Sequence, residues 1–137
     1  MSHAEHLSAV LEPNTKAVII DDSATTRRIL RQLLETFGIE VHDENDASAA
    51  LAYLEREIGS TQIILSDIVM PTMNGFEFCY RLQHADWYDG TPLVMVSTQS
   101  DATSVIKVLK LGADDYIPKP FDREVLAQVI GRVLSHD

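Results

Sequence analysis

Short, continuous runs of apolar residues alternate along the chain with longer stretches in which apolar residues recur every three or four positions. The clearest runs are Lys16 to Ile20, Ile63 to Ser66 and Leu93 to Ser97, and a shorter one is Tyr116-Ile117. Runs of this kind, with few polar interruptions, are typical of strands that are buried on both faces of a sheet. A weaker strand is predicted from Ile39 to His42.

The four stretches between these runs and the stretch after the last one predict five helices. Ser23 is a candidate N-cap of the first helix, which stops at Gly38, and Asp122 is a candidate N-cap of the last. The three helices between them are predicted from Ala47 to Arg56, from near Gly75 to Leu82, and from Asp101 to Leu111. The apolar positions at helical spacing are Ile29, Leu30, Leu33, Leu34 and Phe37; Ala50, Leu51 and Leu54; Phe76, Phe78, Cys79 and Leu82; Val105, Val108 and Leu109; and Val125, Leu126, Val129, Ile130, Val133 and Leu134.

The alternation of strands and helices defines the predicted fold class. Residues 1–15 show no clean period and are predicted as a loose or partly helical leader, followed by a single domain over residues 16–137. Five strand–helix alternations predict an α/β fold in which helices cover both faces of a parallel sheet. In open sheets of this kind, ligands bind beyond the carboxyl ends of the strands, near the switch in strand order.

Reactive side chains follow four of the predicted strands. Asp21-Asp22, Asp67, Ser97 and Lys119 each stand at or just after the end of one. Each alone is more often a cap, a turn residue or a solvated side chain, but their shared position at strand ends favours a site. Three converging carboxylates need a cation to compensate their charge, and a compact set of oxygen ligands favours Mg²⁺. Lys119 and Ser97 would contact phosphoryl oxygens, and a carboxylate oxygen of Asp67 would attack phosphorus to form an aspartyl-phosphate.

Composition narrows the classes of function. The net charge of −10 argues against direct binding to nucleic acid. No apolar run approaches the roughly 20 residues that span a bilayer, and the N-terminal residues lack the pattern of a signal peptide. The single cysteine, Cys79, excludes an internal disulfide and suits a reducing cytoplasm; within a helical pattern it is predicted to be a buried apolar residue. A cytoplasmic protein that does not contact membranes is therefore expected.

The residues at the strand ends belong to longer motifs, and as a set these are highly specific. The chain resembles the receiver domains of response regulators in bacterial two-component signalling, and is similar to the single-domain chemotaxis type, from about Lys16 to Leu134. The residues that carry the resemblance are Asp21-Asp22-Ser23, Asp67 to Gly75, Ser97-Thr98, and Gly112 to Phe121. The resemblance implies a doubly wound, flavodoxin-like, three-layer fold with a five-stranded parallel sheet in the order 2-1-3-4-5 and five helices.

The resemblance also implies a role for each site residue. Asp67 would accept a phosphoryl group from a histidine kinase or a histidine phosphotransfer protein, with Lys119 in contact with that group. Mg²⁺, with Mn²⁺ as a substitute, would bind Asp22 and Asp67 directly, Asp21 largely through water, and the backbone carbonyl of Val69. The bond between Lys119 and Pro120 would be cis. Ser97 and Tyr116 would form a switch that changes the face around the helix 101–111 and the last strand, although Tyr116 alone is more simply an aromatic residue at a sheet edge.

Three positions depart from the family pattern. Ser97 stands where threonine is also common, and Ile68 stands where some chemotaxis members carry tryptophan. Val69, two residues after Asp67, offers no side-chain donor to an attacking water, whereas Gln99, two residues after Ser97, offers an amide. We therefore expect Val69 to lengthen the lifetime of the phosphoryl group, with Gln99 as a second position that affects it.

Several functions remain open from the sequence. We favour a switch that acts by binding an unidentified downstream protein, as a monomer or a phosphorylation-dependent dimer. Its only catalysis would be acceptance of its own phosphoryl group and slow self-dephosphorylation, so it is not expected to be an enzyme in any further sense. A phosphate sink without output has the same site, and an aspartate-nucleophile phosphatase would need an acid where Val69 stands. Arg27, Arg28 and Arg31 form a basic patch that is either a kinase-docking surface or a solvated helix face. Trp87-Tyr88 either forms an exposed contact or closes over the core.

Overall fold

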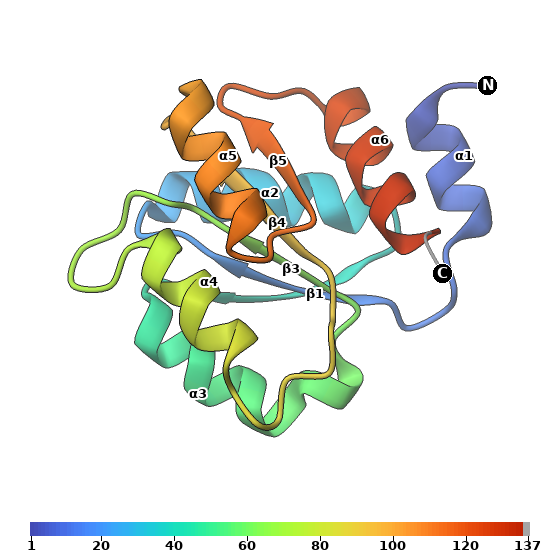
Figure 1. Ribbon diagram of the computed structural model, residues 1–137. Helices are drawn as coiled ribbons and strands as arrows, with labels where there is room; N and C mark the ends of the chain where they lie inside the picture. Colours follow the sequence, from blue (N-terminus) through green and yellow to red (C-terminus); the bar gives the residue numbers. More distant parts are fainter. Residues whose placement is uncertain (136–137) are drawn as a thin grey trace.

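Five parallel strands form the centre of the computed structural model, which describes residues 1–135 (Figure 1). The strand order is β2-β1-β3-β4-β5, which confirms the predicted order 2-1-3-4-5 and the flavodoxin-like fold. The strands are β1 (Lys16–Ile20), β2 (Glu40–Glu44), β3 (Ile63–Ser66), β4 (Leu93–Ser97) and β5 (Asp115–Pro118). The helices are α1 (His3–Val10), α2 (Ala24–Thr36), α3 (Ala47–Glu57), α4 (Gly75–Gln83), α5 (Ala102–Lys110) and α6 (Arg123–Leu134), and a short 3₁₀ helix, η1 (Ile58–Ser60), follows α3.

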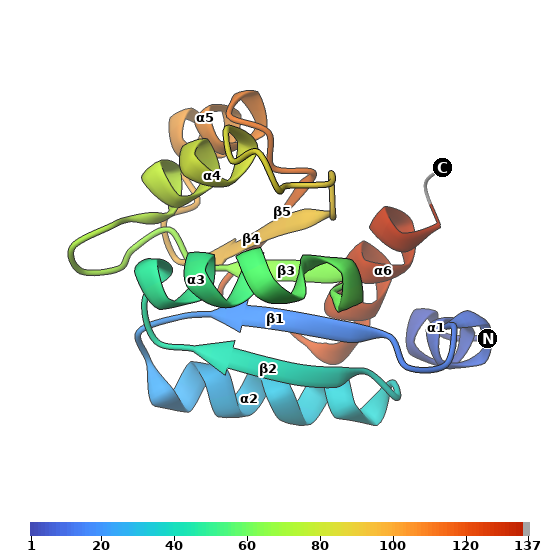
Figure 2. The same cartoon turned by 90° about the horizontal axis from the view of Figure 1, so that it is seen from below.

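Two apolar cores lie on opposite faces of the sheet, because successive side chains of a strand point to opposite sides. Ala17 and Ile19 of β1 pack in one core with α1, α2 and α6. Val18 and Ile20 of the same strand pack in the other with α3, α4 and α5. Figures 1 and 2 show α2 and α3 on opposite sides of the sheet. Burial on both faces explains why the central strands read as continuous apolar runs.

The structure contains a sixth helix, α1, within the segment predicted as a loose or partly helical leader, so the expected number of five helices was wrong. Helix α1 lies beside α6 in both views (Figures 1 and 2), and Ala4 and Leu7 are buried in the core shared with α2 and α6. Its N-terminus receives a carboxylate from another element: Glu124 of α6 accepts hydrogen bonds from the amides of His3 and Ala4, at 2.9 and 3.1 Å. Two buried positions in eight residues give no readable period, which is why the sequence showed only a leader.

Element ends differ from the predictions by a few residues. The strands β1, β3 and β4 have the predicted bounds, whereas β2 runs from Glu40 to Glu44 rather than from Ile39 to His42. The predicted caps are confirmed, since the side chains of Ser23 and Asp122 accept from backbone amides at the starts of α2 and α6. Among residues 1–135, no helix combines the length and apolar character needed to cross a bilayer.

Three apolar residues expected to face the core are instead exposed: Ile29, Leu109 and Val125. Leu109 was predicted to face inward, but α5 buries Ser104 and Val108 and turns the next residue outward. Trp87 and Tyr88 are half-buried and pack against the core between the sheet and α3, α4 and α5. Of the two interpretations of this pair, packing over the core is the one that the structure supports. Cys79 is buried, as predicted.

Candidate functional site

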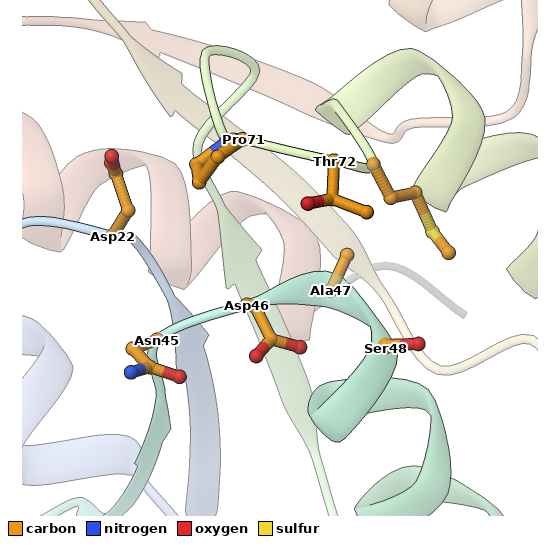
Figure 3. A pocket seen from close by; sticks show the side chains of 8 residues that line it. Asp22, Asn45, Asp46, Ala47, Ser48, Pro71 and Thr72 are labelled. Carbon is orange, nitrogen blue, oxygen red and sulfur yellow. The ribbon is translucent and has the colours of Figure 1, made fainter.

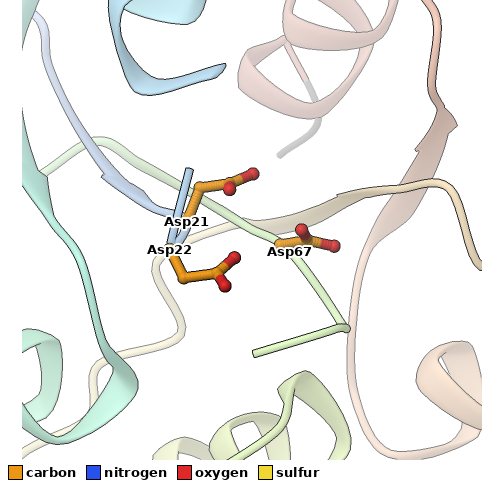
Figure 4. A group of neighbouring side chains, drawn as sticks. All are labelled: Asp21, Asp22 and Asp67. Atoms are coloured by element: carbon orange, nitrogen blue, oxygen red, sulfur yellow. The ribbon is translucent and has the colours of Figure 1, made fainter. Parts of the chain in front are cut away.

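The register of the sheet places Asp21 beside Asp67. Ile20 of β1 pairs with Ser66 of β3, so the next residue of each strand leaves the sheet at the same level. The amide of Asp67 donates to the carbonyl of Ile20 at 2.9 Å, which continues the ladder past the last paired residues. Parallel strands therefore bring together two carboxylates that are 46 positions apart in the sequence. Figure 4 shows the side chains of Asp21, Asp22 and Asp67 extending to the same side.

Asp67 is buried and held in one orientation. The residue is only 6% exposed, and its Oδ1 accepts hydrogen bonds from the backbone amides of Ile68 and Val69 at 2.6 and 3.2 Å. The two amides leave Oδ2 directed toward Lys119, whose amine lies 3.1 Å away. A carboxylate fixed in this way reacts from one geometry, which is what an in-line attack requires.

Lys119 joins the two buried carboxylates. Its amine donates to Oδ2 of Asp21 at 2.8 Å as well as to Asp67. Burial alone would lower the pKa of Lys119, but the hydrogen bonds and charges of Asp21 and Asp67 outweigh it and raise the pKa above its usual range. Burial raises the pKa of Asp21, which is only 1% exposed, and the amine of Lys119 and the amide of Ser23 partly offset that effect. The peptide bond between Lys119 and Pro120 is cis.

The acidic cluster fits a divalent cation. Asp21, Asp22 and Asp67 each offer a carboxylate oxygen, and these oxygens lie within 4.8 Å of one another. Asp22 is exposed whereas the other two are buried, so the cluster opens to solvent on the side of Asp22. A set of hard oxygen ligands with one open side matches Mg²⁺, which keeps several of its waters.

An open groove of about 510 Å³ borders the cluster on the side of Asp22 (Figure 3). One wall is the start of α3, with Asn45, Asp46 and Ser48, and the other is the loop after β3, with Pro71 and Thr72. Thr72 adopts a positive φ of 68° within that loop. The groove gives a partner molecule an approach to the exposed face of the cluster.

The predicted switch residues, Ser97 at the end of β4 and Tyr116 in β5, meet at the carboxyl end of β4. The hydroxyl of Ser97 accepts from the amide of Gln99 at 3.2 Å. The hydroxyl of Tyr116 donates to the carbonyl of Ser97 at 2.9 Å and to that of Gln99 at 2.7 Å. The side-chain amide of Gln99 is not turned toward Asp67 but donates to Ser104 of α5 at 2.9 Å. Val69, by contrast, is 52% exposed beside Asp67.

Two contributors to the site were missed in the sequence. A Cβ at Gly75 would lie 2.5 Å from the carbonyl oxygen of Asp67 and 2.6 Å from Cα of Ile68. Only glycine therefore lets α4 begin this close to the backbone of Asp67 and Ile68. The motif Asn74-Gly75 was noted as part of the resemblance, but nothing in it revealed this contact. Arg27 donates to the carbonyl of Asp21 at 2.7 Å, a contact from α2 that spacing alone does not indicate.

The fold and the site together define a doubly wound α/β domain with an acidic centre at the carboxyl edge of its sheet. The family model of the response regulator receiver domain matches residues 17–131. The chain therefore belongs to the response regulator receiver domains, the signal-receiving modules of two-component systems, which interact with histidine kinases or phosphotransfer proteins and with downstream effectors. The family generally binds Mg²⁺, in agreement with the acidic cluster.

Similar proteins are of two lengths. The chain is 32% identical over 121 residues to the chemotaxis protein CheY1 of Helicobacter pylori, covering 88% of this chain and 97% of that protein. It is 36% identical over 119 residues to the probable transcriptional regulator ycf27 of Porphyridium aerugineum, which covers 87% of this chain but only 48% of that protein. The chain thus spans about half the length of some relatives and nearly the whole of others.

Solved structures show the same fold. The chemotaxis response regulator CheY4 of Vibrio cholerae superimposes with a TM-score of 0.80 at 32% identity, over 88% of this chain and 98% of that one. A response regulator from Chloroflexus aurantiacus superimposes with a TM-score of 0.84 at 25% identity, over 91% of this chain and 100% of that one. The family model matches from residue 17 onward, so α1 lies outside the matched residues.

Proposed function

We propose that Asp67 accepts a phosphoryl group from a histidine kinase or a histidine phosphotransfer protein in a Mg²⁺-dependent reaction, and that the chain acts as a phosphorylation-controlled switch. The observation that carries the proposal is the fixed carboxylate of Asp67, held by two backbone amides and faced by Lys119 within the acidic cluster. We place the signalling domain at residues 16–137 and the leader, which carries α1, at residues 1–15.

In this reaction a carboxylate oxygen of Asp67 attacks phosphorus as the bond from phosphorus to the donor imidazole breaks. The electron pair of that bond stays on the imidazole nitrogen. The ammonium group of Lys119, positioned by Asp21 and Asp67, neutralises charge on a phosphoryl oxygen. A bound Mg²⁺ would offset the charge of the carboxylates and of the phosphoryl group, held by Asp22 and Asp67, by Asp21 largely through water, and by the backbone carbonyl of Val69. Mn²⁺, with the same preference for oxygen, would take its place.

The output of the switch is assigned to Ser97 and Tyr116. When the hydroxyl of Ser97 turns to a phosphoryl oxygen, it gives up the bond from the amide of Gln99. That amide belongs to the loop whose carbonyls accept from Tyr116, so the tyrosine is released to rotate. The face formed by α5 and β5 then changes, and a downstream protein binds it; Ile106 and Leu109 are exposed apolar residues on α5.

The lifetime of the phosphoryl group is assigned to Val69 and Gln99. The side chain of Val69 is exposed next to Asp67 and has no polar atom to orient a water, so it slows hydrolysis. The same feature speaks against a phosphatase, which needs a proton donor for turnover. A phosphate sink shares every residue of this site, so binding of a target by the phosphorylated form is what separates the two functions. We place the protein in the cytoplasm, as a monomer or a phosphorylation-dependent dimer.

The direct test is incubation with Mg²⁺ and a small acyl- or amido-phosphate donor, followed by mass spectrometry. We expect a base-labile gain of one phosphoryl group that is absent in Asp67→Asn and absent without the metal. A stable adduct in Asp67→Asn would refute the assignment of Asp67. Continuous release of phosphate from the wild type would instead favour the phosphatase.

A further inference from the structure

Arg27, in the first turns of α2, contacts the backbone of the acidic cluster, and its side chain is only 19% exposed. Its Nη1 donates to the carbonyl oxygen of Asp21 at 2.7 Å, and its Nε donates to Oδ2 of Asp43 at 3.2 Å. The guanidinium therefore joins the end of β1 to β2. A planar group with several fixed donors can hold two acceptors at once, which a lysine cannot do in the same geometry.

Asp43 is held in turn by a second arginine. Nη2 of Arg31, one turn further along α2, donates to Oδ1 of Asp43 at 2.8 Å, and its Nη1 donates to the carbonyl of Val41 at 3.0 Å. Two of the three arginines of the predicted basic patch are thus engaged within the domain. Only Arg28 is exposed. The patch is mainly a brace between α2 and β2 rather than a free docking surface.

The carbonyl that Arg27 contacts belongs to the peptide between Asp21 and Asp22. The other polar groups of Asp21 are also fixed: its amide donates to the carbonyl of Glu44 at 3.2 Å, and its Oδ1 accepts from the amide of Ser23 at 2.9 Å. Rotation of this one peptide would move Asp22, whose exposed carboxylate has no comparable set of backbone contacts among the described residues. The contact from Arg27 thus limits the position of Asp22.

We infer that Arg27, oriented by Asp43, is a positioning residue for the divalent-cation site: it fixes the Asp21-Asp22 peptide so that both carboxylates face Asp67. The inference rests on the proposed Mg²⁺-dependent function. It adds to that function a residue that contacts neither the cation nor the phosphoryl group. Partners that orient metal ligands in this way commonly change metal affinity by 10- to 100-fold when they are removed.

The direction in which the Mg²⁺ affinity changes when Arg27 is replaced separates a positioning role from a purely electrostatic one. A guanidinium near an acidic cluster repels a cation, so removing its charge alone would tighten Mg²⁺ binding. Loss of positioning would weaken binding instead. Arg27→Gln removes both the charge and the bridge, whereas Arg27→Lys keeps the charge and removes the bridge. Arg28→Gln is the matched control, because it makes the same change of charge one residue along the same helix, at an exposed position.

The experiment measures the Mg²⁺ affinity of each purified variant by calorimetric titration with MgCl₂ at fixed ionic strength. Each titration is run below the melting temperature of that variant, which is measured first without the metal. We expect about tenfold weaker binding in both Arg27→Gln and Arg27→Lys. We expect Arg28→Gln to bind as the wild type does or slightly more tightly. Unchanged or tighter binding in Arg27→Gln overturns the inference, as does an equal weakening in Arg28→Gln.

A double-mutant cycle with Asp43→Asn tests the pair as a unit and covers the case in which one variant fails to fold. If Asp43 acts through Arg27, Asp43→Asn weakens Mg²⁺ binding in the wild type but much less in Arg27→Gln. Additive effects would overturn the proposed relay. A wild type that binds Mg²⁺ but accepts no phosphoryl group would refute the proposed function and leave this inference standing, whereas unaltered Mg²⁺ affinity in Arg27→Gln would overturn only the inference.

Discussion

The side-chain amine of Lys119 lies 3.1 Å from Oδ2 of Asp67, across 52 positions of the sequence. The same amine lies 2.8 Å from Oδ2 of Asp21, so one ammonium compensates two buried carboxylates. A divalent cation at this cluster interacts with the same carboxylates. We therefore expect Lys119 to have two opposed effects: it would stabilise charge on the phosphoryl group and it would oppose binding of the metal.

Replacing Lys119 separates these effects. In Lys119→Met we expect tighter Mg²⁺ binding, because the competing ammonium is gone, together with phosphoryl transfer slowed by about 100-fold, because one preorganised positive group is lost. Calorimetry gives the first quantity and single-turnover phosphorylation at saturating Mg²⁺ gives the second. Lys110→Met, at an exposed position on α5, is the control. If the Mg²⁺ affinity and the rate of phosphoryl transfer both fall in Lys119→Met, the two opposed roles are disproved.

Gly75 is required by a close approach of backbone to backbone. A methyl group there would meet the carbonyl of Asp67 at 2.5 Å, and neither atom belongs to a flexible side chain. We expect Gly75→Ala to lower the free energy of unfolding by about 2 kcal/mol and to slow phosphorylation, because the loop that carries Asp67 must shift. Urea denaturation measures the first effect. Gly59→Ala, where a Cβ would meet nothing within 4 Å, should change stability by no more than about 0.5 kcal/mol.

Glu124 makes the docking of α1 sensitive to acid. Hydrogen bonds from the amides of Ala4 and His3 lower the pKa of Glu124 below its usual 4.5. An acid with a lowered pKa contributes stability that is present above its ordinary pKa and is lost as the pH falls through the lowered value. We expect Glu124→Gln to melt below the wild type at pH 7, and the difference to shrink as the pH falls below about 4.5.

Hydrogen exchange of the α1 amides should localise this loss, with faster exchange in Glu124→Gln at neutral pH. Glu55→Gln, at an exposed position on α3, controls for the general loss of an acidic charge. A melting difference between the wild type and Glu124→Gln that does not depend on pH would contradict the role of the carboxylate.

The sequence predicted the central part of the fold and most of the site for physical reasons. The central strands are buried on both faces, so their apolar runs were continuous and their bounds were read correctly. Because all strands are parallel, residues at their carboxyl ends had to share one edge, which brought Asp21, Asp67 and Lys119 together. The caps at Ser23 and Asp122 depend on local chemistry only and were equally accessible.

What the sequence did not show depends on contacts between distant elements. Helix α1 buries only Ala4 and Leu7, and it is held by Glu124, about 120 positions away, which accepts from its first amides. The bond between Arg27 and the carbonyl of Asp21 involves a backbone group, which leaves no trace in residue types. The orientation of an exposed or half-buried amide, as in Gln99, depends equally on a tertiary partner.

Val69 sets the first prediction about the lifetime of the phosphoryl group. It is exposed beside Asp67 and apolar, so Val69→Asn adds a donor and acceptor that can orient an attacking water. We expect loss of the phosphoryl group to speed up by about fivefold, the factor that corresponds to one net hydrogen bond of about 1 kcal/mol. The decay of the phosphorylated form after removal of the donor measures it, with Val69→Leu as an apolar control. An unchanged rate of phosphoryl loss in Val69→Asn would contradict the assignment of the lifetime to Val69.

Ser104 supplies the last prediction, because it determines where the amide of Gln99 points. This serine is buried, accepts from Nε2 of Gln99 at 2.9 Å and donates to Oδ1 of Asp101 at 2.8 Å. In Ser104→Ala the amide loses its acceptor and is free to turn toward Asp67. We expect faster loss of the phosphoryl group in Ser104→Ala, again by about fivefold, since one net hydrogen bond is redirected.

The double variant Ser104→Ala/Gln99→Ala tells this effect apart from damage to α5. If Ser104 acts by holding the amide away, removing Gln99 restores the slow decay of the wild type. If the serine matters only because it supports the start of α5, the double variant decays as fast as Ser104→Ala alone. The melting temperature of each variant, measured beside the decay, shows whether the helix has been weakened, and a slow decay in Ser104→Ala itself would contradict the prediction outright.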